Sequence, residues 1–180
     1  MKQIKDDYFL DVDDKMLEYL ELESSKCVES INQSIFSNKE NSYKLLNLLI
    51  VGVGASFLLI TQSDKVDFFT MLLLIFCTGW TICLVLLAVF CLKPKKKPIL
   101  GNSPLDLYSE YYKKLEDYNK LSILRRYKLS TTEDIINILT EEDDRVGRWL
   151  DRVIILSVIT PITSIIFSFL VHYLQILAQA

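Results

Sequence analysis

Residues 68–92, FFTMLLLIFCTGWTICLVLLAVFCL, form a run of 25 residues without a charged side chain. An α-helix rises about 1.5 Å per residue, so about 20 apolar residues cross a hydrocarbon core about 30 Å thick. The run is too long and too uniformly apolar for a buried helix in a water-soluble core. It therefore predicts a helix that spans a membrane.

Two further runs have the same character. Residues 45–61, LLNLLIVGVGASFLLIT, lie at the short limit for a span, and residues 153–180 carry His172 as their only ionisable side chain. Lipid offers no hydrogen bonds to an open backbone, so spans of this kind have to be helical. We therefore predict an all-α integral membrane protein with three transmembrane helices and a small helical cytoplasmic region.

The positions of lysine and arginine predict the orientation. Basic residues precede the first span, follow the second and precede the third, whereas the loop 62–67 holds a single lysine. All the basic clusters lie on one side if the N-terminus is cytoplasmic and the C-terminus external. The predicted parts are a cytoplasmic N-terminal helix (1–44), a transmembrane hairpin (45–92), a cytoplasmic helical segment (93–152) and a third transmembrane helix (153–180).

The polar segments carry helix signals of their own. Residues 13–42 contain no proline or glycine and run directly into the first span, which predicts one continuous helix. Its apolar face is predicted at Met16, Leu20, Cys27, Ile31 and Ile35, and Glu21 is expected to lie outside this face. After a proline-rich break, Ser103 and Pro104 have the pattern of a helix start, and 130–133 (STTE) have capping-box spacing for a second start. The acidic run 141–144 is expected to be a solvated turn, with a helix from about 143 into the third span.

Composition and motifs exclude several classes of function. The net charge is −3, divided as −4 over residues 1–44, −1 over 62–67 and +2 over 93–152. No segment has the strongly basic face that duplex nucleic-acid binding needs. The four cysteines form no C-x-x-C pair or zinc pattern, and His172 is the only histidine. No nucleophile, phosphate-loop or zinc-protease motif occurs. We expect no enzyme activity, no metal and no cofactor.

A polar stripe on the third span is the candidate functional site. Six residues at steps of three or four fall within an arc of about 80° on a helix: Ser157, Pro161, Ser164, Ser168, His172 and Gln175. Polar groups in a membrane rarely face lipid, so the stripe faces protein or water. Two interpretations stay open. The stripe lines a pore built by several copies, or it is a packing interface between helices.

Four arginines are candidates for holding an anionic ligand. Arg125 and Arg126 lie on one expected helix, and Arg145 and Arg148 lie on the next. Guanidinium groups match phosphate oxygens in geometry and charge, so packing of the two helices would make a phosphate-binding pocket. The alternative is that these are ordinary surface arginines.

The layout resembles small bacterial phage-defence membrane effectors of the SLATT and Pycsar types. The likeness lies in a helix over 21–61, a turn at 62–67, the span 68–92 and the segment 132–150 before the last span. The resemblance implies a multi-pass protein of the inner membrane, an oligomer that permeabilises it, and a partner enzyme that makes a nucleotide second messenger or oligonucleotide. The third span departs from a two-span member.

These observations together predict a homo-oligomeric membrane effector or channel surrounded by lipid. Three helices of one subunit cannot enclose a channel, so several copies are required, with a tetramer as a working number. Cytoplasmic helices would sense the ligand and the third span would line the path, in anti-phage defence by membrane permeabilisation. The alternative is a non-conducting accessory, anchor or immunity protein that binds a partner through its polar third span.

Overall fold

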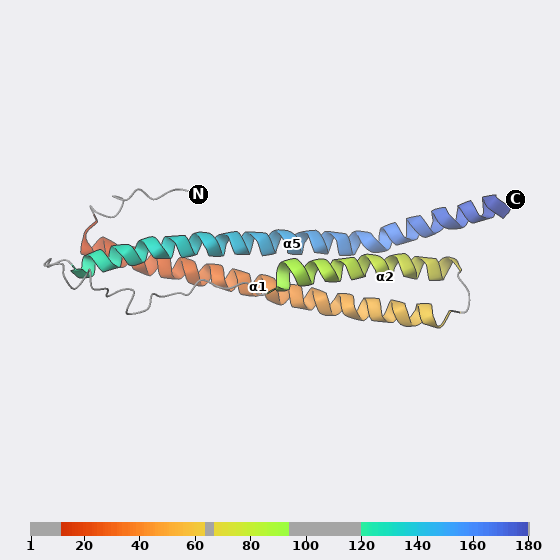
Figure 1. Ribbon diagram of the computed structural model, residues 1–180, viewed down its shortest axis with the longest axis horizontal. Helices are drawn as coiled ribbons and strands as arrows, with labels where there is room; N and C mark the ends of the chain where they lie inside the picture. The colour runs from red at the N-terminus through yellow and green to blue at the C-terminus, as the bar shows by residue number, and fades with distance from the viewer. Residues whose placement is uncertain (1–11, 64–66, 94–119, 180) are drawn as a thin grey trace. The chain divides into compact units, whose positions relative to one another are not determined.

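The computed structural model describes residues 12–63, 67–93 and 120–179. They form α1 (Asp14–Thr61), α2 (Phe68–Leu87), a short π-helix η1 (Ala88–Leu92) and α5 (Lys120–Gln179), and no strand occurs among them (Figure 1). The predicted all-α fold is confirmed. Three helical segments are long and apolar enough to cross a membrane: one in α1, one in Phe68–Leu92 and one in Leu121–Leu174.

The chain divides into two compact units, each with contributions from α1 and α5. The first, here called the polar unit, comprises Met1–Ile35 and Lys95–Asp144. The second, the apolar unit, comprises Phe36–Pro94 and Arg145–Ala180. Each unit has its own core and is described separately.

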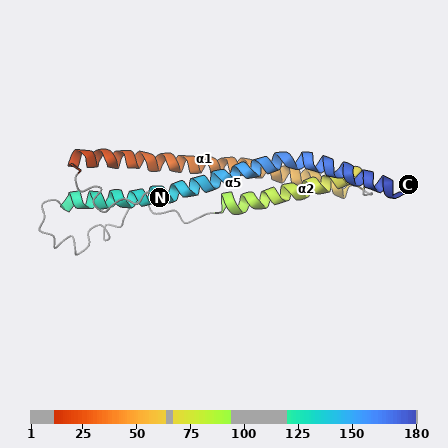
Figure 2. The same ribbon diagram turned by 90° about the horizontal axis from the view of Figure 1, so that it is seen from above.

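The polar unit pairs the first part of α1 with the first part of α5. The two helices run in the same direction, because Glu21 contacts Arg125 and, further along both helices, Ser34 contacts Asp143. A small apolar cluster lies between them, built from Val28, Ile31, Ile35, Ile135, Ile136 and Leu139. Figures 1 and 2 show the helices side by side in both views.

The buried positions on α1 follow a heptad pattern. Leu17, Val28 and Ile35 are buried, and Glu21, Ser24 and Ile31 between them are half-buried. Together the six positions follow one another at alternating steps of four and three residues. This spacing is typical of helices that wind around each other. Of the face predicted from the sequence, Ile31 and Ile35 are confirmed in this interface. Met16 and Cys27 are exposed, and Leu17 and Val28, one position further along, are buried in their place.

The predicted helix start at residue 130 was also wrong. α5 runs unbroken from Lys120, and the hydroxyls of Thr131 and Thr132 donate to the carbonyls of Tyr127 and Lys128. Because these hydroxyls bond to the preceding turn, they are not available to cap a new helix. The helix start predicted at Ser103 lies outside the described residues.

The acidic run 141–144 is helical and is not a solvated turn. Glu142 is buried, and Asp143 accepts a 2.7 Å hydrogen bond from Ser34 Oγ. The carboxylate of Asp143 therefore joins the two helices of the polar unit. The expected unbroken helix from residue 13 into the first apolar run is confirmed, since α1 begins after Asp13 and ends at Thr61.

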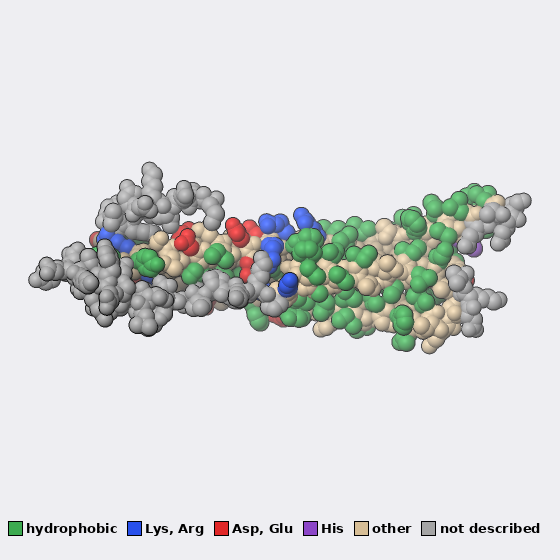
Figure 3. Space-filling model, in the orientation of Figure 1, with side chains coloured by type: hydrophobic (Ala, Val, Ile, Leu, Met, Phe, Trp, Pro, Cys, Tyr) green, Lys and Arg blue, Asp and Glu red, His purple; other side chains and the backbone are tan. Residues whose placement is uncertain are grey.

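The apolar unit packs α2 and η1 against the second part of α1 and the second part of α5 (Figure 2). Its core takes residues from all of them: Leu49, Cys83, Leu87, Cys91, Val146, Leu150 and Val153. Large apolar side chains also cover its outside, and Figure 3 shows Lys and Arg side chains gathered where that apolar surface begins. A surface of this kind suits lipid rather than water.

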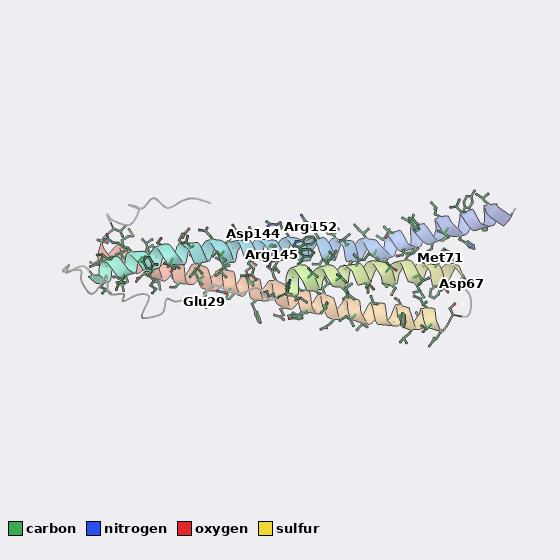
Figure 4. The ribbon with its side chains drawn as sticks, viewed as in Figure 1. Glu29, Asp67, Met71, Asp144, Arg145 and Arg152 are labelled. Carbon is green, nitrogen blue, oxygen red and sulfur yellow. The ribbon has the colours of Figure 1, made fainter. Side chains whose placement is uncertain are left out.

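The start of α2 is fixed by its cap. Asp67 Oδ1 accepts hydrogen bonds from the backbone N–H and from the hydroxyl of Thr70, both at 2.8 Å, and Thr70 Oγ1 lies 2.9 Å from Ser63 Oγ. These bonds lower the pKa of Asp67 below its usual value, with the backbone bond from Thr70 as the largest cause. Figure 4 shows Asp67 at the end of α2 that follows the loop.

Candidate functional site

The predicted stripe on α5 faces the interior of the apolar unit over most of its length. Ser157, Ser164 and Ser168 are buried, with 9%, 0% and 1% of their surface exposed, and Pro161 is half-buried. His172 is exposed, and its ring lies edge-on to Phe68 with 5.7 Å between centroids. The backbone of Gln175 belongs to α5, and its side chain lies outside the described part of the chain.

Small residues let the three helices approach closely beside this stripe. Trp80 Nε1 on α2 donates a 3.1 Å hydrogen bond to the carbonyl oxygen of Ser157. The Trp80 ring lies directly against Gly52 of α1, and Thr160 of α5 lies directly against Gly79 of α2. At both glycines an added Cβ would overlap the neighbouring side chain, so a larger residue at either position would force that side chain to move.

The hydroxyl groups of this region bond mainly within their own helices. Ser157 Oγ donates to the carbonyl of Ile154, Ser164 Oγ donates to that of Thr160, and Ser56 Oγ donates to that of Gly52, at 2.7–2.8 Å. Ser168 Oγ is buried and has no hydrogen-bond partner within the described residues. The polar stripe therefore adds close packing but few hydrogen bonds between helices.

Burial of the stripe inside one chain fits the packing interpretation directly. A pore around an axis shared by several copies requires the same serines to face that axis. In the arrangement described they are buried within the apolar unit, and Trp80 of α2 contacts the backbone of Ser157. The pore interpretation therefore requires a second arrangement of the three helices.

The arginines of the polar unit already have partners. Arg125 Nε and Nη2 donate to Glu21 Oε2 at 3.2 and 3.1 Å, and about three-quarters of each side chain is shielded from solvent. The hydrogen bond to Glu21 is the main cause that raises the pKa of Arg125. Arg126 Nη2 donates to the carbonyl oxygen of Val12 at 2.9 Å. These contacts join the two helices of the polar unit.

All four arginines lie on the single helix α5, so the two helices that were expected to carry them are one helix. Arg125 and Arg126 belong to the polar unit, whereas Arg145 and Arg148 belong to the apolar unit. Figure 4 labels Arg145 and Arg152 on α5. Binding of an anion by these arginines stays a prediction.

One cluster at the start of the apolar unit was missed from the sequence. Phe90 of η1 stacks on Trp149 of α5, with 4.0 Å between ring centroids and 8° between planes, and the Arg152 guanidinium lies 5.1 Å from the Trp149 ring. Arg148-Trp149-x-x-Arg152 directly before an apolar run is a signal that could have found it, because tryptophan and arginine concentrate at membrane–water interfaces.

Comparisons with protein-family models, with curated proteins and with solved structures find no match to this chain. Within residues 12–63, 67–93 and 120–179, no three His, Cys, Asp or Glu side chains converge as metal ligands would. What is established is a helical protein with three segments able to cross a membrane, which is the composition of a multi-pass membrane protein.

Proposed function

We propose that this chain is the subunit of a homo-oligomeric membrane effector that opens a permeation path when its polar unit senses a ligand. The three apolar helices and the basic residues at one end of the apolar unit support insertion with the N-terminus in the cytoplasm of a bacterial inner membrane. The structure described would then be the closed arrangement.

The hydroxyl stripe inside the apolar unit carries the proposal. Serines are costly against lipid and are here buried together in a membrane-spanning helix. Because their hydroxyls bond to their own helix, separating α5 from α1 and α2 breaks few hydrogen bonds; the bond from Trp80 to Ser157 is one of them. Separation exposes a polar face that water can wet, and the same faces of several copies enclose the path.

The polar unit offers a point where an anionic ligand acts. A nucleotide phosphate at Arg125 competes with Glu21 for the same guanidinium, which weakens the contact between α1 and α5. The ligand shifts the equilibrium only if it binds the open arrangement more tightly than the closed one. Competition with Glu21 supplies such a difference in affinity. A role in anti-phage defence belongs to this proposal through the signalling nucleotide.

The test is ion flux from liposomes that contain the full chain. Purified protein is reconstituted with phosphatidylcholine and phosphatidylglycerol, and potassium efflux is followed while cyclic nucleotides and short oligonucleotides are added one at a time. In a chain whose own four cysteines are replaced by alanine, single cysteines are placed at Ser157, Ser164 and Ser168 and labelled with a water-soluble maleimide. Ile155→Cys and Ile159→Cys are the controls on the opposite face. Labelling of the serine positions only during efflux supports the pore. Efflux with those positions still shielded places the path elsewhere.

A second function is favoured by the same burial. If the stripe serves only to pack one chain, the protein is a non-conducting accessory, anchor or immunity protein. That function predicts no efflux with any nucleotide and a stable complex with a second membrane protein after mild detergent extraction. Efflux from protein purified to homogeneity would exclude it.

A further inference from the structure

The face of α5 opposite the polar stripe carries two arginines followed by an unbroken row of isoleucines. The six residues follow one another at alternating steps of four and three and lie within an arc of about 80° on the helix: Arg148, Arg152, Ile155, Ile159, Ile162 and Ile166. All six are exposed, and all belong to the apolar unit. Ser157 lies nine positions after Arg148, which is half a turn around the helix.

We propose that this row, the arginine–isoleucine seam, binds an anionic phospholipid. The headgroup phosphate lies against Arg148 and Arg152, and an acyl chain lies along the isoleucines. The inference rests on insertion of the apolar unit in a membrane and does not require a pore.

The dimensions of the seam fit one lipid leaflet. Eleven positions separate Ile155 from Ile166, or about 17 Å of helix, and one leaflet contributes about 15 Å of hydrocarbon. The isoleucines are therefore long enough as a row to cover a full acyl chain. The branched isoleucine side chains have few rotamers, so they lose little conformational entropy when an acyl chain packs against them.

The head of the seam has the chemistry of a phosphate site at a membrane surface. Arg152 packs over Trp149, whose ring also stacks on Phe90, so the guanidinium is held at the point where the charged residues end and the apolar row begins. Guanidinium groups donate two hydrogen bonds to one phosphate, and a tryptophan at this level suits the interfacial region. Phosphatidylglycerol adds a net negative charge that phosphatidylcholine lacks.

Charge also argues against a second copy of the chain on the same seam. Isoleucines at heptad spacing pack well against another helix in general. A copy seated symmetrically on this seam would bring its own Arg148 and Arg152 beside these two arginines. Like charges brought together in this way disfavour association, whereas a phosphate neutralises them.

The experiment measures which lipid the full-length protein retains. The protein is reconstituted in equimolar phosphatidylglycerol and phosphatidylcholine, extracted in mild detergent, and its bound lipids are counted by native mass spectrometry. We expect phosphatidylglycerol to be enriched, and each of Arg148→Gln and Arg152→Gln to reduce the enrichment about fivefold at low salt. Lys26→Gln, which removes an exposed cation from the polar unit, is the control and should leave the enrichment unchanged.

Two results would overturn the proposal. One is equal retention of the two lipids, or enrichment that both arginine variants keep in full. The other is efficient disulfide formation between copies through Ile162→Cys, in a chain whose own four cysteines are replaced by alanine, because it would place a second copy on the seam. Neither result bears on the pore, which is tested separately by efflux.

Discussion

Replacing Gly52 with alanine is expected to destabilise the apolar unit, because this glycine leaves room for the ring of Trp80. A Cβ added at Gly52 would overlap Trp80 Cζ3 and lie 2.6 Å from Trp80 Cε3. The ring would have to move away from α1. Movement of the ring also displaces Trp80 Nε1, which donates a 3.1 Å hydrogen bond to the carbonyl of Ser157 on α5.

The magnitude follows from three terms. Overpacking a filled interior costs about 1–3 kcal/mol. Loss of the bond from Trp80 to Ser157 costs about 1 kcal/mol. Alanine recovers about 1 kcal/mol because it is a better helix former than glycine. The net loss is therefore about 1–3 kcal/mol, which for a chain of this size lowers Tm by about 2–12 °C at 2–4 °C per kcal/mol.

The assay is thermal unfolding of the full chain in mild detergent, followed by circular dichroism and by tryptophan fluorescence. Gly54→Ala is the matched control, two residues away on the same helix, where an added Cβ meets nothing within 4 Å. It should keep or slightly raise Tm through helix propensity alone. Equal Tm changes in the two variants would refute the argument that Gly52 is required by contact with Trp80.

Three further predictions test other contacts in the two units. Gly79→Ala should lower Tm because its Cβ would lie 2.5 Å from Thr160 Cγ2. Adding Thr160→Ser to this variant should restore most of the lost Tm, because serine lacks that methyl group. A double variant with no recovery of Tm would show that the strain lies elsewhere. Glu21→Arg should make the polar unit more sensitive to limited proteolysis by placing like charges together, and the swapped pair Glu21→Arg/Arg125→Glu should recover resistance unless the contact is unimportant. Asp67 has a lowered pKa, so its cap on α2 contributes stability above its unfolded pKa of about 4, and this stability is lost as pH falls through the folded pKa. Asp67→Ala should lower Tm at pH 7 and make Tm less dependent on acid pH, whereas Asp67→Asn should keep part of the cap. An unchanged dependence of Tm on acid pH in both variants would contradict this.

The three long apolar helices could be predicted because their signal does not depend on tertiary contacts. A run such as 68–92 has to be helical in lipid whatever packs against it. The start at residue 130 failed for the opposite reason. Serine and threonine hydroxyls can bond forward to a cap or backward to the preceding turn, and the sequence 130–133 fits both. The contacts with α1 in the polar unit favour the continuous helix.

The polar stripe shows a different limit of sequence-based prediction. The cost of a polar group in lipid predicts that the stripe faces protein or water, and Ser157, Ser164 and Ser168 are buried. It gives no information on which helix covers them. The glycines that make the cover possible, Gly52 and Gly79, lie on two other helices, and their fit to Trp80 and Thr160 depends on tertiary packing.

The two faces of α5 limit how the stripe could become exposed. The serines and the arginine–isoleucine seam lie on opposite sides of the same helix, so a half-turn of α5 in place would expose the serines. It would also move Arg148 and Arg152 into the core beside Leu49 and Leu87. Charged side chains buried in such a core are far costlier than exposed serines. An opening that keeps the arginines at the surface therefore separates α5 from α1 and α2 without rotating it, and lipid on the seam would remain bound in both arrangements.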